Sequence, residues 1–245
     1  MIRVRDLGIE FHQGRRRHLR VRELLFHGFR RSPHRGTFWP LRHVDFDIAP
    51  GEAVGVVGRN GTGKSTLLKL IAGVLVPDEG SVRLNGKVAP LLELSAGFAY
   101  DLTGRENVHL VGALHGIKPA QMRKKFDRIV EFAGEQVQRS LDSPVRHYSS
   151  GMRVRLGFSV IAQLEHPILL VDEVMAVGDA EFRQKCYDTM ESLLAQGRTL
   201  LLVSHNEDDL TRFCTRGLFI NEGGLCVDGS MNDALRAYKE AVAAS

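Results

Sequence analysis

The chain has 245 residues, of which 43% are hydrophobic and 25% charged, a composition typical of a soluble globular protein with room for one α/β domain. No stretch approaches the ~18 apolar residues of a membrane span, and the first residues lack an apolar run of signal-peptide length. The net charge of +4 hides one basic block, because residues 15–35 hold eight arginines and one acid (+7), which leaves −3 for the remainder. A nucleic-acid-binding protein would more often spread basic residues over one face of its fold, so this balance speaks against that class.

Three cysteines, Cys186, Cys214 and Cys226, are too few and too scattered for a disulfide framework or a zinc site. Each lies in an apolar stretch, so we expect buried free thiols in a reducing compartment. Together with the missing membrane span, this predicts a cytoplasmic protein, or one that rests on a membrane without crossing it.

The chain opens with an alternating pattern that predicts a strand over residues 2–11. The basic block follows, and within it Val21, Leu24, Leu25 and Phe29 recur at the spacing of one helix face. The pattern is then broken by one glycine and two prolines: Pro33, Gly36 and Pro40.

Beyond the basic block, residues 41–58 read as a strand, a turn and a second strand. Helical patterns follow over residues 63–73, 104–115, 119–133, 150–165, 181–196, 206–214 and 231–243. The short apolar runs 168–171 and 199–203 predict buried strands, and their alternation with helices favours a largely parallel sheet. The segment from about 90 to 165 is mostly helical, so we expect a helical subdomain inserted into the α/β core.

A phosphate-binding motif, GRNGTGKST, occupies Gly58–Thr66 between an apolar strand and an apolar helix. The glycines let the backbone turn tightly and aim its N–H groups at a triphosphate, Lys64 would reach the β- and γ-phosphates, and the Ser65 hydroxyl would hold Mg²⁺. The alternative, a glycine-rich turn that binds nothing, is disfavoured by the flanking strand and helix. We expect the whole loop to bind a nucleoside triphosphate: Gly58, Arg59, Asn60, Gly61, Thr62, Gly63, Lys64, Ser65 and Thr66.

Two further strand ends carry candidate catalytic groups. The run ILLVDE puts Asp172 at the carboxyl edge of the sheet, where it can hold the metal through water, and Glu173 where it can accept a proton from the attacking water. His205 follows the apolar run 199–203 and is placed to sense the γ-phosphate. Taken singly, an Asp-Glu pair after a strand marks a strand-end turn as often as a catalytic site. A lone histidine is usually a structural residue.

The stretch HYSSGM leads into the helix predicted from residue 150. Ser149 or Ser150 would serve as the N-cap of that helix, which is the more common role for such residues. A helix N-terminus is also an anion site, because its unpaired N–H groups carry partial positive charge. The residues alone leave both interpretations open.

Taken in order, GRNGTGKS, YSSGM, ILLVDE, AVGD and SH resemble the ATPase subunit of an ABC transporter over nearly the whole chain. The resemblance implies an α/β fold of the P-loop NTPase class, with a mostly parallel sheet core, an antiparallel β subdomain and an inserted helical subdomain. It implies a single ABC ATPase domain over 1–245, divided as follows: α/β core 1–90 and 166–230, basic amphipathic insertion 15–35, helical subdomain about 91–165, and C-terminal helix 231–245.

The same resemblance assigns roles across a pair of subunits, with ATP and Mg²⁺ as cofactors. Ser149, Ser150 and Gly151 would contact the γ-phosphate held on the phosphate loop of a second copy arranged head to tail. Asp179 of the AVGD motif would lie at the subunit interface and couple the two sites. The same residues would then form both the cap of the helix and the anion site.

Longer stretches narrow the resemblance, since YSSGMRVRLGF, DEVMAVGDAEFRQKC and AGFAYDLTGRENV are similar to ATPases that export bacterial surface polysaccharides. That group serves O-antigen, capsule, teichoic acid and cell-wall galactan, and the basic insertion is more like the O-antigen and teichoic-acid branch. The resemblance implies a permease on a separate chain, a lipid-linked polysaccharide near residues 18–30, no nucleic acid, and a peripheral place at the cytoplasmic face of the cell (inner) membrane. The chain ends at Ser245 without the C-terminal sugar-binding domain of some O-antigen ATPases, so we expect the membrane partner or the coupled synthesis machinery to select the substrate.

Two features depart from the family pattern, and one assignment stays open. The usual Leu-Ser-Gly-Gly-Gln motif is replaced by Tyr-Ser-Ser-Gly-Met, and the expected glutamine is missing from residues 89–104, where Glu93 is the nearest polar candidate. For the aromatic ring that stacks on adenine, Phe11 fits best and Trp39 is the alternative, although either could simply pack under the sheet.

Three competing functions remain at this stage. Export of capsular polysaccharide or teichoic acid would use the same motifs. A soluble ATPase of this superfamily acting on nucleic acid or ribosomes tends to carry two cassettes or a long coiled coil, and this chain has one motif set and no heptad run. Import of a small solute is disfavoured by the Tyr-Ser-Ser-Gly-Met motif and the missing glutamine.

Overall fold

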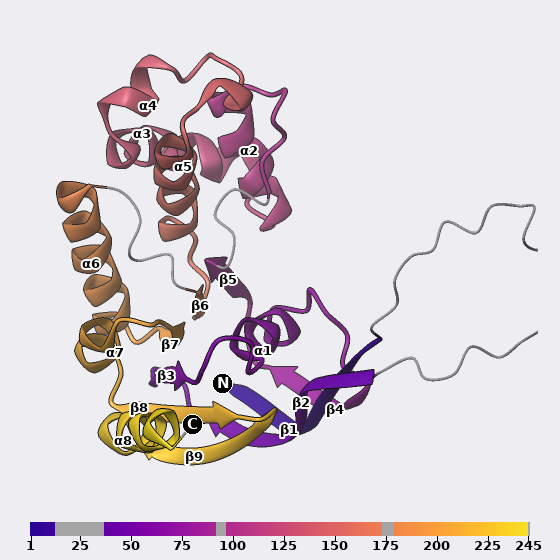
Figure 1. Cartoon of the computed structure of the whole chain (residues 1–245). Helices are drawn as coiled ribbons and strands as arrows, with labels where there is room; N and C mark the ends of the chain where they lie inside the picture. Colours follow the sequence, from indigo (N-terminus) through magenta and orange to yellow (C-terminus); the bar gives the residue numbers. More distant parts are fainter. Residues whose placement is uncertain (13–36, 92–96, 173–178, 245) are drawn as a thin grey trace, which may run out of the picture.

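The apolar runs of the sequence form a six-stranded sheet in the computed structural model, which describes residues 1–12, 37–91, 97–172 and 179–244 (Figure 1). Its strand order is β5–β6–β7–β3–β8–β9, and the neighbours are parallel except for the antiparallel pair β8–β9. The strands span the following residues: β3 Ala53–Val57, β5 Val88–Leu91, β6 Ile168–Asp172, β7 Thr199–Val203, β8 Arg216–Asn221 and β9 Gly224–Ser230. The predicted α/β class with a mostly parallel sheet is therefore confirmed.

Both faces of the central strands are buried, as the continuous apolar runs require. Along β7, Leu200 and Leu202 face one hydrophobic cluster, whereas Leu201 and Val203 face another. The first cluster is completed by the helices α6 (Ala180–Ala195), α7 (Glu207–Phe213) and α8 (Met231–Ala243). The second is completed by α1 (Lys64–Ile71) and by a smaller sheet.

The smaller sheet is antiparallel, with the order β2–β1–β4. Its strands are β1 Ile2–His12, β2 Thr37–Ile48 and β4 Glu79–Leu84. Pro40 lies inside β2, although the sequence placed a break there. This is possible because β2 is an edge strand of its sheet, where a residue without an N–H group interrupts no ladder on the outer side.

Four helices form a separate subdomain with its own hydrophobic core: α2 Gly104–Leu114, α3 Pro119–Ala133, α4 Glu135–Arg139 and α5 Ser150–Ala162. Figure 1 shows them together at the top of the molecule, above the ends of β5 and β6. The start of α2 is fixed by a capping box between Thr103 and Glu106. The buried Asn107 side chain bonds both the N–H and the carbonyl of Ala99, which holds the entering segment in place.

Two smaller expectations are corrected by the structure. Cys186 and Cys214 are buried, but Cys226 is exposed, because its strand β9 lies at the outer edge of the sheet. The short helix α4 was not predicted, since five residues are too few for a periodic pattern. Among the described residues, no helix has both the length and the apolar character needed to span a bilayer.

Candidate functional site

The sheet topology brings three sequence motifs to one edge. Val203, the last residue of β7, is paired with Asp172 at the end of β6 and with Val56 near the end of β3. These strands are parallel, so their carboxyl ends meet at the same edge, where ligands of open α/β sheets bind. The phosphate loop after β3, Asp172 and His205 therefore lie close together, as the sequence predicts.

The phosphate loop has the backbone that its glycines were expected to provide. Gly63 caps α1 in the left-handed region with φ 97°, where a side chain would be strained and would also collide with the backbone carbonyl of Pro40. At Gly58, a side chain would collide with the carbonyl of Ile220 on β8. The loop therefore fits tightly between β2 and β8 and leads directly into α1.

Lys64 is the charged group of this loop. Its side chain is only 6% exposed, and its ammonium group donates to the carbonyls of Gly58 at 2.7 Å and Arg59 at 2.8 Å. Thr62 also donates to the Arg59 carbonyl, at 2.9 Å. The bonds hold the cation inside the loop, where it can interact with an anion bound by the surrounding N–H groups.

A cavity of about 220 Å³ opens over this loop. Its lining combines loop residues with groups from two other elements: Phe11, Phe38, Pro40, Asn60, Gly61, Gly63, Lys64, Ser65, Thr66 and His205. His205, from the loop after β7, and Ser65, from the first turn of α1, are both exposed. The structure thus places six of the nine predicted phosphate-loop residues and the predicted sensor histidine around one cavity, whose lining does not include Gly58, Arg59 and Thr62.

Two aromatic rings stand on one side of this cavity. Phe11 of β1 and Phe38 of β2 are directly paired across the antiparallel ladder and are 41% and 47% exposed. Phe38 was not singled out from the sequence; the only signal for it is its position opposite Phe11. Trp39, the alternative ring for stacking, follows Phe38 on the strand and lies under the Arg42 guanidinium, 4.4 Å from its ring centroid. The paired phenylalanines, and not Trp39, therefore line the cavity.

Ser65 and Asp172 are suited to hold Mg²⁺ at this edge of the sheet. Both present oxygen atoms, the ligand type that Mg²⁺ prefers, and such ions usually take only one or two protein ligands and complete their coordination with phosphates and water. Among the described residues there is no cluster of three or more carboxylate, histidine or cysteine side chains that could hold a metal without such help. A metal ion here would depend on the phosphates of a bound nucleotide.

The Ser-Ser-Gly motif stands at the N-terminus of α5. Ser149 is the N-cap, and its hydroxyl accepts a bond from the N–H of Met152 at 3.2 Å. Ser149 and Ser150 are exposed and Gly151 is half-buried, and in the part of the chain that the structure describes none of them lines the cavity over the phosphate loop. The motif is therefore presented to the outside of the subunit.

Asp179 is the N-cap of α6 and is tied to α5. Its carboxylate accepts the N–H of Phe182 at 2.9 Å and pairs with the guanidinium of Arg155. The bond from Phe182 and the nearby Arg155 hold the pKa of Asp179 below its usual range. Asp179, the last residue of the AVGD motif, thus caps a helix whose start is fixed to the helix of the Ser-Ser-Gly motif.

Several predicted residues lie outside the described part of the chain. They are the proposed base Glu173, the polar candidate Glu93, and the basic insertion 15–35 with the polymer-contacting segment 18–30.

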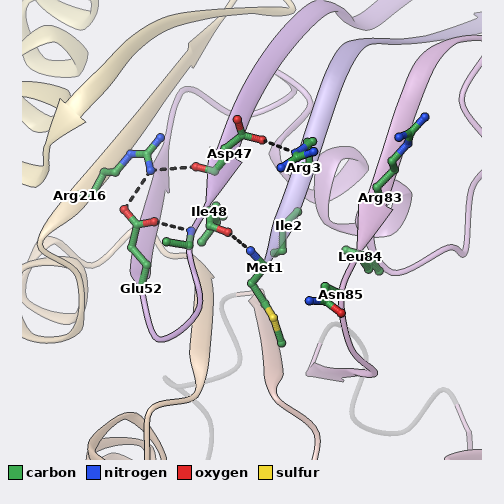
Figure 2. A pocket seen from close by; sticks show the side chains of 11 residues that line it. Met1, Ile2, Arg3, Asp47, Ile48, Glu52, Arg83, Leu84, Asn85 and Arg216 are labelled. Carbon is green, nitrogen blue, oxygen red and sulfur yellow. Dashed lines mark hydrogen bonds and ion pairs between the residues drawn. The ribbon is translucent and has the colours of Figure 1, made fainter.

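A larger cavity of about 610 Å³ lies on another side of the molecule, where β1, β2 and β4 meet the main sheet (Figure 2). Arg216 bridges the two sheets there, because it donates to the carbonyl of Asp47 and to the Glu52 carboxylate, both at 2.9 Å. It is also paired with Asp228 at 2.6 Å, and these carboxylates raise its pKa. Because its charge is already neutralised by carboxylates, this arginine serves the junction between the sheets and does not form a phosphate site.

Comparisons with known proteins agree with this geometry. Residues 41–176 match the family model described as ABC transporter. The chain is 43% identical to the O-antigen export system ATP-binding protein RfbB of Klebsiella pneumoniae, with 91% of each chain covered. It is 38% identical to the teichoic acids export ATP-binding protein TagH of Listeria monocytogenes, over 84% of this chain and 61% of that protein.

Solved structures with the same fold include a dimeric post-hydrolysis state of the ATP-binding cassette MJ0796 bound to ADP and Pi. That structure covers 94% of this chain at 20% identity, with a TM-score of 0.75.

Proposed function

The chain belongs to the ABC transporter family, and we propose that it is the ATP-hydrolysing subunit of an exporter that moves a lipid-linked, O-antigen-like polysaccharide across the cytoplasmic membrane. The observation that carries the enzymatic part is the convergence of the phosphate loop, Asp172 and His205 at one edge of the sheet. The transport part is supported by the high identity to relatives named for O-antigen and teichoic acid export.

In this proposal each side chain has a defined task. Lys64 and the loop N–H groups bind the β- and γ-phosphates of ATP, and Phe11 stacks on the adenine ring beside Phe38. Ser65, and Asp172 through water, would hold Mg²⁺, which when bound would neutralise charge on the phosphates. Glu173 accepts a proton from the attacking water, and His205 contacts the γ-phosphate.

The Ser-Ser-Gly motif supports a second copy of the chain as partner. Ser150 and the Gly151 amide stand at an exposed helix N-terminus, where an anion is favoured, yet they do not line the chain's own described phosphate cavity. A head-to-tail dimer would bring this motif to the γ-phosphate on the partner's loop. Asp179 would then lie at the interface between the two subunits.

The remaining partners follow from transport. Since no described helix could span a bilayer, a membrane permease on a separate chain would form the pathway, and this subunit would bind peripherally at its cytoplasmic side. The domain division that fits this role is a single ABC ATPase domain, with the core in 1–90 and 166–230, the insertion 15–35, the helical subdomain about 91–165 and the final helix 231–245.

The test combines enzymology with export. The gene would be deleted in its own host, restored as wild type or as Lys64→Ala, and polysaccharide would be measured at the surface and inside the cell. We expect wild type to restore surface polymer and Lys64→Ala to leave it inside, while the purified wild-type chain hydrolyses ATP. Normal surface polysaccharide in the deletion strain, or ATP hydrolysis that depends on added nucleic acid, would contradict the proposal.

A further inference from the structure

Asp209, on the first turns of α7, is a buried carboxylate that the proposed chemistry does not use. It is 4% exposed, and it accepts hydrogen bonds from the Tyr187 hydroxyl at 2.6 Å and from the Ser204 hydroxyl at 3.5 Å. Burying a charged group is costly unless hydrogen bonds compensate for the lost water. The two hydroxyl groups are therefore fixed relative to this carboxylate.

Ser204 directly precedes His205, so its position bears on the histidine. The Ser204 hydroxyl also accepts the N–H of Asn206 at 3.0 Å, and it thereby bonds the residue on the far side of His205. The Asn206 side chain in turn caps α7 by accepting the N–H of Asp208 at 2.9 Å. The two neighbours of His205, Ser204 and Asn206, are thus bonded to each other. The carboxylate of Asp209 orients the Ser204 hydroxyl that makes this bond.

The second donor to Asp209 comes from α6. The Tyr187 ring packs against Phe213, with centroids 5.7 Å apart, and lies under the guanidinium of Arg212 at 4.8 Å. Burial, and then the bond to Asp209, raise the pKa of Tyr187 to about 12, so its hydroxyl remains a donor at neutral pH. These contacts therefore tie α6 to α7, the helix that follows the loop of His205.

The N-terminus of α6 is tied to the Ser-Ser-Gly helix. Arg155 of α5 pairs with Asp179, the N-cap of α6, and the Arg155 guanidinium lies 4.6 Å from the ring centroid of Phe182. The helix α6 thus contacts α5 at its N-terminus and, through Tyr187 about midway along it, Asp209 beside the loop of His205.

We propose that Asp209 is a positioning residue for His205. Because Tyr187 of α6 donates to Asp209, this positioning would depend on where α6 lies. The inference rests on the proposed function, because it assigns Asp209 an effect on ATP hydrolysis at that site. A shift of α5 and Asp179 when two subunits close would be carried along α6 to the histidine. Misplacing a catalytic group by about 1 Å can cost on the order of 100-fold in rate.

The test uses Asp209→Ala, which removes both bonds, and Tyr187→Phe, which keeps the ring packing and removes one donor. Asp208→Asn, at an exposed neighbouring position, is the matched control. We expect Asp209→Ala to lower kcat by about ten- to 100-fold with little change in KM for ATP, and Tyr187→Phe to lower it less. The control should retain wild-type kcat.

A double variant separates positioning from general loss of structure. If Asp209 acts through His205, then Asp209→Ala should not slow a His205→Ala enzyme further, whereas an independent structural effect would multiply the two losses. Equal fold-losses from Asp209→Ala in both backgrounds would overturn the inference.

A second readout does not depend on ATPase activity. Hydrogen exchange at the N–H of Asn206 should accelerate in Asp209→Ala and Tyr187→Phe but not in Asp208→Asn, because the Ser204 hydroxyl loses its orientation. A wild-type chain that hydrolyses no ATP would refute the proposed function, whereas unchanged exchange in both variants would refute the positioning role alone. Since Tyr187→Phe keeps its ring contacts, it remains informative even if Asp209→Ala fails to fold.

Discussion

The ammonium group of Lys64 lies 2.7 Å from the backbone carbonyl oxygen of Gly58, so the first residue of α1 closes the phosphate loop onto its own beginning. The side chain is buried, and its cation is directed by the loop carbonyls toward the cavity that Ser65 and His205 also line. In the proposed function Lys64 would have two roles, since it holds the shape of the loop and would supply positive charge to a bound phosphate.

Replacing Lys64 with alanine should therefore weaken nucleotide binding itself. The loop would lose both its cation and two internal hydrogen bonds, so we expect ATP affinity to fall by at least about tenfold, the effect of roughly 1.4 kcal/mol. Equilibrium titration with a fluorescent ATP analogue measures this directly, with Lys69→Ala on the same helix as the control. Unchanged affinity in Lys64→Ala would count against the phosphate-loop assignment.

Glu173→Gln should separate binding from turnover. The glutamine cannot accept a proton from the attacking water, while Asp172 at the end of β6 is unaltered, so ATP should still bind. Loss of a general base typically lowers the rate by ~10²–10⁴-fold. Steady-state hydrolysis and size-exclusion chromatography with ATP are the measurements, and we expect slow turnover with accumulation of an ATP-bound dimer. A rate close to that of wild type would remove Glu173 from this role.

The site was largely predictable because its signals are local. A glycine-rich loop between an apolar strand and helix, and polar residues directly after two apolar runs, are contiguous patterns that parallel topology then brings to one edge. The helix over 231–243 was predicted for the same reason, since its apolar residues recur regularly. A local pattern predicts whether a segment is a helix or a strand. The parallel sheet then determines that the carboxyl ends of its strands lie at the same edge.

Features that depend on distant contacts were not predictable. Phe38 acquires its place from pairing with Phe11 across the ladder, and the proline two residues later concealed the strand. The contact from Tyr187 through Asp209 to Ser204 joins α6, α7 and the end of β7, and none of these residues belongs to a recurring pattern. Strand β9 was missed because half of its residues are exposed polar or glycine positions at the sheet edge.

Catalysis should require residues from two subunits. Ser150→Arg would place a bulky cation at the N-terminus of α5 and prevent closure on the partner's γ-phosphate. Both this variant and Lys64→Ala should be inactive alone, but mixed dimers would contain one intact site, formed by a good loop and a good Ser-Ser-Gly motif. We expect mixing to restore part of the ATPase activity.

The matched control is the double variant Lys64→Ala, Ser150→Arg, which can form no intact site with either single variant. Mixed dimers that assemble, as shown by co-purification of two tags, but that recover no activity would argue against the shared site.

Stability should depend on pH through a histidine pair of which His166 is buried and His115 half-buried. The rings of His115, at the end of α2, and His166, before β6, lie 5.5 Å apart. Burial lowers the pKa of both, with Lys87 adding repulsion at each and His115 and Arg198 adding further repulsion at His166. Below the unfolded pKa of about 6.5, the unfolded chain binds protons that the folded chain resists, so stability is lost as the pH falls through this range.

Urea unfolding at pH 7.5 and pH 5.5 tests this. The free energy of unfolding should be lower at pH 5.5, and the difference should shrink in the variant His115→Gln, His166→Gln. His147→Gln, an exposed histidine of the same subdomain, serves as the control and should keep the wild-type difference. An undiminished pH dependence in the double variant would show that the pair does not cause it.

The basic insertion 15–35 has no role in the proposed steps of ATP hydrolysis. In a helical conformation its sequence would place Val21, Leu24, Leu25 and Phe29 on one side among charged residues, a pattern typical of segments at a membrane–water boundary beside anionic headgroups. The alternative is a solvated arginine-rich loop. We predict that residues 18–30 guide or gate the lipid-linked polymer at the cytoplasmic mouth of the permease.

Changing Leu24, Leu25 and Phe29 together to serine should sharply reduce surface polysaccharide and spare ATP binding, because none of them belongs to the phosphate-binding motif Gly58–Thr66. The control replaces Leu24 and Leu25 with methionine and Phe29 with leucine, which preserves the apolar stripe and should preserve export. Surface polymer, permease level and ATP affinity would be measured in each strain. A triple serine variant with normal surface polymer would show that the segment is only a loop, whereas loss of export together with loss of ATP binding would show that it supports the ATPase fold and not the polymer.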